Sequence, residues 1–147
     1  QIIKNPSFEE LKKILQESAR YKDRILSVHS RRSSDDVVSM IGSNFPGTII
    51  LHWYGGSTST LRKALTSGYF FSINPAMIVS GNGQSIIKAL PLERILTETD
   101  GPFTDLNKKV TTPPDIQLVI NYLAKLHGKT SEEIAKIVKV NFSKFLD

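Results

Sequence analysis

Cysteine is absent from the 147 residues of this chain. Its absence excludes disulfide bonds, thiolate metal sites and catalysis by a cysteine nucleophile. A chain without cysteine is also compatible with a reducing compartment, so we expect a cytoplasmic protein.

Long apolar runs are absent as well. No segment approaches the roughly 18 apolar residues that a membrane-spanning helix requires, so we expect no membrane partner. The sequence contains no signal-peptide or transit-peptide pattern, and it begins at Gln1 without an initiator methionine. This start fits a processed product, an expressed fragment or part of a longer chain.

Neither sign of charge is strongly in excess. The chain has 19 Lys and Arg against 14 Asp and Glu, a formal net charge of +5. This balance favours anionic partners, although it is a weak indication in a chain of this length. Hydrophobic residues make up 39% of the sequence, which suffices for one domain over residues 1–147.

Helical and strand-like patterns alternate along the chain. Four short apolar segments predict strands at 25–29, 48–52, 69–74 and 94–100. Stretches with helical spacing surround them at 7–19, 33–41, 57–67, 84–90, 113–126 and 130–146. Successive strands begin about 20 to 25 residues apart, which suits parallel strands joined by helices. The pattern therefore predicts an α/β fold of parallel βα units.

Polar residues stand at the carboxyl ends of the four predicted strands: His29, His52, Asn74 and Asp100. In parallel sheets these ends meet at one edge, where functional residues collect. A single histidine or aspartate at such a place is more often structural. Two imidazoles and one carboxylate together suit a divalent cation, so we predict a metal site of His29, His52 and Asp100.

Of three further residues, two allow more than one interpretation. Arg31 could clamp a phosphate or remain a solvated loop charge. Trp53 could stack on a nucleic-acid base or anchor its loop in the core. His127 lies in the last turn of a predicted helix, where it suits the helix dipole, and we assign it no chemistry.

Three motifs resemble those of a known family in both order and spacing. They are Val28-His29-Ser30-Arg31, Leu51-His52-Trp53-Tyr54-Gly55-Gly56 and Leu96-Thr97-Glu98-Thr99-Asp100-Gly101-Pro102. They look like the last three metal-ligand motifs of the TatD-family deoxyribonucleases, and the resemblance covers nearly the whole chain. Within that family, the His-Ser-Arg-Arg and Glu-Thr-Asp-Gly-Pro-Phe runs are most similar to QatD of the Qat anti-phage systems.

The resemblance implies a metal-dependent (β/α)8 barrel, related to the amidohydrolases, that hydrolyses DNA phosphodiester bonds. It implies that His29, His52 and Asp100 bind metal, and that Asp100 also helps to activate the attacking water. It further implies that Arg31 stabilises charge on the phosphoryl oxygens. Glu98 would then orient an imidazole or the Asp100 loop.

Two features of the family are missing from this sequence: a His-x-His motif on the first strand, and a glutamate from a middle strand. We therefore expect the C-terminal half of a TIM-type barrel, with extra C-terminal helices. The N-terminal half would come from a longer chain, from another protein or from a second copy. The complete barrel would hold two divalent cations (Mg, Mn or Zn) and bind DNA, and the isolated chain would be a poor catalyst.

Two other classes of function remain open. The first is an amidohydrolase-type enzyme with a small substrate, whose turnover would depend little on salt, whereas phosphate-backbone binding weakens steeply. The second is a non-catalytic barrel subunit that binds other proteins of a defence complex. Metal analysis with His29→Ala and His52→Ala as controls would separate the enzymes from the subunit.

Overall fold

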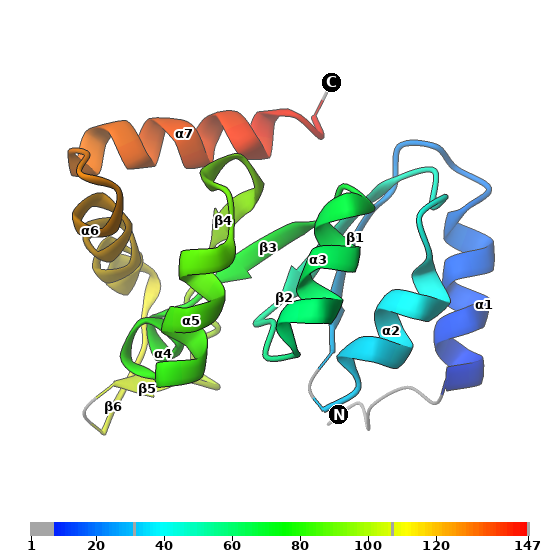
Figure 1. The fold of residues 1–147 in the computed structure, drawn as a ribbon, viewed down its shortest axis with the longest axis horizontal. Coiled ribbons are helices and arrows are strands. Elements are labelled where there is room, and N and C mark those ends of the chain that lie inside the picture. Colours follow the sequence, from blue (N-terminus) through cyan, green and yellow to red (C-terminus); the bar gives the residue numbers. More distant parts are fainter. Residues whose placement is uncertain (1–7, 31, 107, 147) are drawn as a thin grey trace.

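The centre of the molecule is a parallel sheet of four strands (Figure 1). The computed structural model describes residues 8–30, 32–106 and 108–146. The strands lie in the order β1 (Ile25–His29), β2 (Thr48–His52), β3 (Phe70–Ile73) and β4 (Ile95–Thr97). Each neighbouring pair is parallel, which confirms the predicted α/β class.

Helices connect the strands and follow the sheet. They are α1 (Phe8–Ser18), α2 (Ser34–Ile41), α3 (Thr58–Thr66), α4 (Pro75–Val79), α5 (Gly81–Ala89), α6 (Ile116–His127) and α7 (Ser131–Ser143). Short 3-10 turns at Leu92–Arg94 and Pro113–Asp115 precede β4 and α6. A small antiparallel hairpin, β5 (Asp105–Leu106) and β6 (Lys109–Val110), lies between β4 and α6.

The structure differs from the sequence-based expectation around β3 and β4. Helix α4 and the hairpin were not predicted, and α5 begins at Gly81 instead of residue 84. Glycine weakens a helix signal, but the Ser80 Oγ accepts the Gly83 N–H at 3.1 Å and starts α5 there. A Cβ at Gly83 would lie 2.3 Å from the Met77 carbonyl oxygen, so close packing against α4 explains this glycine.

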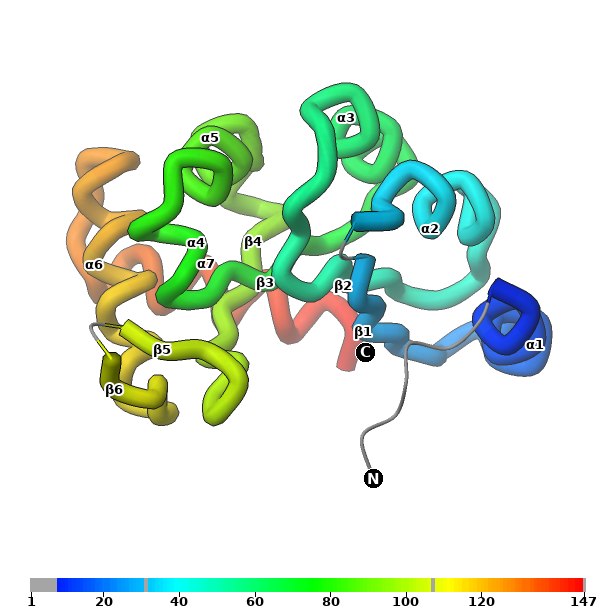
Figure 2. The backbone as a smooth tube through the Cα atoms, turned by 90° about the horizontal axis from the view of Figure 1, so that it is seen from below, coloured from blue at the N-terminus to red at the C-terminus, as the bar shows by residue number. Residues whose placement is uncertain are grey.

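The two faces of the sheet have different surroundings. Helices α2, α3 and α5 lie along one face (Figure 2), and Ile49 and Leu51 of β2 are buried there. The alternate residues Thr48, Ile50 and His52 are only partly buried. Ser27, Ile50, Ser72 and Leu96 of the second face line a groove of about 530 Å³, together with residues of α6 and α7. One face therefore forms the core, and the other borders an open groove.

The C-terminal helix α7 is hydrogen-bonded to the start of β4. Asn141 is 1% exposed, and its Nδ2 donates to the carbonyls of Leu92 at 2.7 Å and Ile95 at 2.8 Å. These bonds satisfy two carbonyls that α7 covers, so they fix the helix against β4. Within the described ranges, no helix has both the length and the apolar character needed to cross a bilayer.

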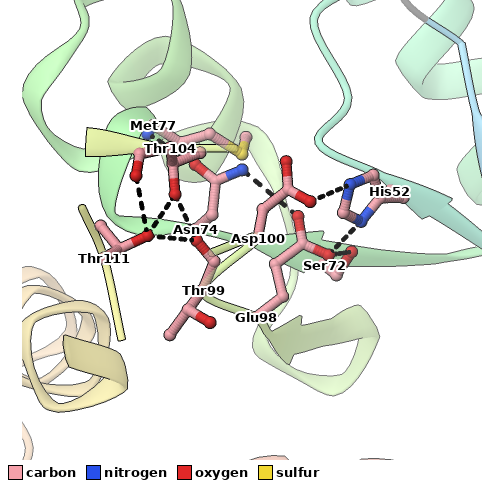
Figure 3. A network of polar contacts seen from close by, with 9 residues as sticks. All are labelled: His52, Ser72, Asn74, Met77, Glu98, Thr99, Asp100, Thr104 and Thr111. Carbon is pink, nitrogen blue, oxygen red and sulfur yellow. Dashed lines mark hydrogen bonds and ion pairs between the residues drawn. The ribbon is translucent and has the colours of Figure 1, made fainter. Parts of the chain in front are cut away.

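The loop after β4 is braced by buried hydroxyl groups (Figure 3). Thr104 Oγ1 donates to the Thr99 carbonyl at 2.6 Å, and Thr111 Oγ1 donates to the same carbonyl at 3.1 Å. The Thr111 N–H donates to the Thr104 carbonyl at 3.0 Å. These bonds hold the segment that contains Asp100 in one conformation.

We expect Gly101→Ala to disturb this loop. A Cβ at this position would lie 2.1 Å from the Thr111 carbonyl oxygen, so the loop would have to shift. The free energy of unfolding should fall by about 1–3 kcal/mol, as measured by urea denaturation. In Gly55→Ala, the matched control, the new Cβ meets nothing within 4 Å, and we expect a change below about 0.5 kcal/mol. Equal losses in the two variants would contradict the close approach.

Candidate metal centre

The parallel register brings His29 and His52 side by side. They are the last residues of β1 and β2 and are paired in the sheet. Ser72 of β3 is paired with His52 from the other side. Because paired positions in neighbouring strands point to the same face, these three side chains share one face at the carboxyl edge.

Asp100 reaches the same place from a loop. The expected strand at 94–100 is too long, because β4 ends at Thr97 and Asp100 adopts the left-handed conformation with φ 53°. Aspartate tolerates this conformation better than most residues. Trp53, directly after His52, also has a positive φ of 44°. Such backbone strain concentrates at functional sites. Here one strained residue is the predicted ligand Asp100, and the other directly follows the predicted ligand His52.

The three predicted metal ligands converge. The rings of His29 and His52 meet edge to face, with centroids 4.1 Å apart, and Asp100 Oδ1 lies 3.2 Å from His52 Nε2. One ligand atom from each of the three residues lies within 4.8 Å of the others. Ligands bound at about 2.0–2.2 Å from one tetrahedral ion lie about 3.3–3.6 Å apart, so the cluster would have to contract by about 1 Å to place all three on one cation. Nitrogen and carboxylate ligands without thiolates suit a borderline or hard divalent cation.

Glu98 lies on the other side of the His52 ring (Figure 3). Its Oε2 is hydrogen-bonded to His52 Nδ1. The side chain of His52 is 14% exposed and that of Glu98 is 15% exposed. A carboxylate on Nδ1 favours the tautomer with its proton there and leaves the Nε2 lone pair for a cation. Nε2 is also the nitrogen that faces Asp100. This contact is the one that an orienting role for Glu98 would require, and that role stays a prediction.

Two carboxylates create a negative field around His52. Burial lowers the pKa of His52, but the hydrogen bond and charge of Glu98, with the charge of Asp100, outweigh it. The pKa of His52 is therefore raised above its ordinary value of 6.5. The same field that favours a protonated imidazole in the absence of metal would favour a divalent cation at this place.

The other predicted residues have different surroundings. Arg31 lies outside the described residues. Trp53 is partly buried and packs against the hydrophobic core, as expected of a loop anchor, and its part in stacking stays a prediction. His127 is not part of the cluster, and its Nε2 is buried without a hydrogen-bond partner in the described ranges. Asn74 is fully buried and caps α4 instead of joining the three-residue cluster.

Ser72 binds Glu98 beside the cluster, and it was not singled out from the sequence as a site residue. Its Oγ donates to Glu98 Oε2. The available signal was a hydroxyl within the otherwise apolar Phe70–Ile73 strand. Ser72 lies two residues before Asn74, so the two side chains point to the same side of the strand. Only the register of β2, β3 and β4 shows which partner it has.

Comparison with known proteins identifies the family of the chain. The family model described as TatD related DNase matches residues 4–147. Human "Deoxyribonuclease TATDN3" is 32% identical over 117 residues, which are 79% of this chain and 43% of that protein. The Bacillus subtilis "Uncharacterized metal-dependent hydrolase YabD" is 26% identical, over 78% of this chain and 48% of that protein. The chain thus spans about half the length of the curated relatives it matches.

A solved structure shows the same fold. The Escherichia coli TatD homolog YJJV superposes with a TM-score of 0.78 at 23% identity. The match covers 90% of this chain and 53% of the other.

Replacement of any predicted ligand should weaken binding of a divalent cation. We expect His29→Ala, His52→Ala and Asp100→Ala each to lower the affinity for Mn²⁺ or Zn²⁺ by at least about 100-fold, as measured by calorimetric titration. His127→Gln is the matched control, because it removes the third histidine of the sequence outside the cluster. A ligand variant that binds metal as well as this control would remove that residue from the site.

Proposed function

The chain belongs to the TatD-related DNase family, and on that premise we propose that it is part of a metal-dependent hydrolase that cleaves DNA phosphodiester bonds. The convergence of His29, His52 and Asp100 is the observation that carries this proposal. The names of the relatives agree with it, since the human relative is a deoxyribonuclease and the bacterial one a metal-dependent hydrolase.

The three residues of the cluster would have different roles in the reaction. A divalent cation held there supplies a Lewis acid to a phosphoryl oxygen and increases the acidity of water. His29 and His52 would bind this cation through imidazole nitrogens, and Asp100 through a carboxylate oxygen. The carboxylate of Asp100 has a second oxygen, which could accept the proton of the attacking water. The family resemblance assigns the phosphate to Arg31, whose guanidinium group would bind it.

The surroundings of the cluster favour an anionic substrate. Helix α3 begins a few residues after the carboxyl end of β2 and carries no acidic residue in its first turn, so its positive dipole end lies at the same edge as the cluster. Helix α2 begins in a similar place after β1, but it carries Asp35 and Asp36 in its first turn. The net charge of +5 also favours an anionic substrate. On these grounds we favour DNA over a small neutral substrate. The similarity of the two motif runs to QatD further supports a role in anti-phage defence, in the cytoplasm.

We also propose that this chain forms the C-terminal half of the family's barrel. In the described ranges β1 pairs only with β2 and β4 only with β3, so both outer strands have a free edge. The matched relatives are about twice as long. A second half that pairs with both edges would cover the open face and supply ligands for a second cation.

Asp100→Asn should strongly reduce DNA cleavage by the full-length protein. Loss of one ligand charge and of the proton acceptor should lower the rate at least about 100-fold in a nuclease assay with Mg²⁺ or Mn²⁺. Asp105→Asn, an exposed carboxylate of β5, is the matched control and should retain wild-type activity. The KM for DNA should rise steeply with salt. A salt-independent KM would favour a small substrate instead, and full activity of Asp100→Asn would refute the assigned role.

The half-barrel proposal predicts a poor catalyst from residues 1–147 alone. Their DNA cleavage rate should be at least about 100-fold below that of the same chain with its complementary half, because ligands and barrel closure are missing. The comparison requires one nuclease assay of both samples. Full, Asp100-dependent activity from these 147 residues alone would show that no second half is needed.

A further inference from the structure

The carboxylate of Glu98 has two donors besides His52, and both come from β3 or its end. Ser72 Oγ donates to Oε2, the oxygen that also binds the His52 ring. Asn74 Nδ2 donates to Oε1 at 3.3 Å. Ser72 is 6% exposed and Asn74 is 0% exposed, so water cannot easily replace either donor. Each carboxylate oxygen is therefore held by a buried group.

Helix α4 fixes the direction of the Asn74 side chain. Asn74 is the N-cap of α4, and its Oδ1 accepts the N–H of Met77 at 3.1 Å. Because the amide oxygen is used by the helix cap, the NH2 group must point the other way, toward Glu98. The start of α4 thus determines where one oxygen of Glu98 lies (Figure 3).

The sheet register fixes the position of Ser72. Ser72 is the partner of His52 in the pairing of β2 with β3, so its hydroxyl and the imidazole lie on the same face. Both groups bind Glu98 Oε2. A carboxylate bound in this way cannot rotate without breaking a hydrogen bond at each oxygen.

From these contacts we infer that Ser72 and Asn74 are positioning residues for the metal centre. They hold the Glu98 carboxylate, and through it they hold the His52 ring in the orientation that turns Nε2 toward the cation. This inference rests on the proposed metal centre. It assigns to α4 a part in metal affinity, although α4 contributes no ligand.

A pair of variants separates this role from the structural role of the cap. Asn74→Asp keeps an oxygen that can cap α4, but it replaces the donor to Glu98 by a second carboxylate oxygen. Ser72→Ala removes the other donor, and Ser72→Thr restores a hydroxyl. Ser80→Ala is the matched control, because Ser80 caps α5 through its bond to the Gly83 N–H and makes no hydrogen bond to Glu98 within the described residues.

The first measurement is the affinity of the full-length protein for Zn²⁺ or Mn²⁺, without substrate. We expect Asn74→Asp and Ser72→Ala to bind about tenfold more weakly, as is typical when an outer partner of a ligand is lost. Ser72→Thr should recover most of the affinity. Ser80→Ala should stay within about twofold of the wild type, even if its melting temperature falls.

The second measurement is the NMR signal of the His52 imidazole in ¹⁵N-histidine-labelled protein. With three histidines in the sequence, the assignment is simple. We expect a Nδ1 proton that exchanges slowly in the wild type and in Ser80→Ala, and rapidly in Asn74→Asp and Ser72→Ala. This readout does not depend on bound metal or on activity.

The outcomes distinguish the inference from the proposed function. Wild-type metal affinity together with an unchanged His52 signal in both variants would refute the positioning role while leaving the metal centre intact. A wild-type protein that binds no metal would refute the proposed centre. In that case, an unchanged His52 signal in the variants would refute the positioning role too, whereas a faster proton exchange would support it.

Discussion

The placement of His52 between two carboxylates is the interaction on which the functional site depends. Glu98 binds Nδ1, and Asp100 lies 3.2 Å from Nε2. A ring bound at one nitrogen has only the other nitrogen to offer, so the direction of the metal-binding lone pair is fixed. The negative charge that raises the pKa of His52 is the same charge that would attract a divalent cation.

The residues around His52 reach it by two structural routes. His29 and Ser72 are brought there by strand pairing. Asp100 comes from a loop held by the Thr104 and Thr111 hydroxyls. Strand pairing holds the sheet, whereas separate hydroxyl hydrogen bonds hold the loop. A change in one of these parts should therefore leave the residues of the other in place. The site is therefore a property of the whole carboxyl edge rather than of one motif.

The open second face of the sheet connects the fold to the proposed function. Helices α2, α3 and α5 cover one face, whereas Ser27, Ile50 and Ser72 border a groove on the other. The strand edges at β1 and β4 have no further partner in the described ranges. These features, with the half-length match to the relatives, support a barrel completed by a second half. Such a half would meet the existing cluster at the same edge.

The alternation of apolar segments was sufficient to predict the parallel α/β class, because strand and helix periods differ and helical connections between successive strands favour parallel order. The polar strand ends were sufficient to predict that His29, His52 and Asp100 meet at one edge. The expected strand at 94–100, however, would have placed Glu98 and Asp100 on the same face of the sheet. Only the tertiary structure decided that they bind opposite nitrogens of one ring, since β4 ends at Thr97 and distant threonines hold the Asp100 loop. The contact of Ser72 with Glu98 also depends on sheet register, which local sequence patterns do not encode.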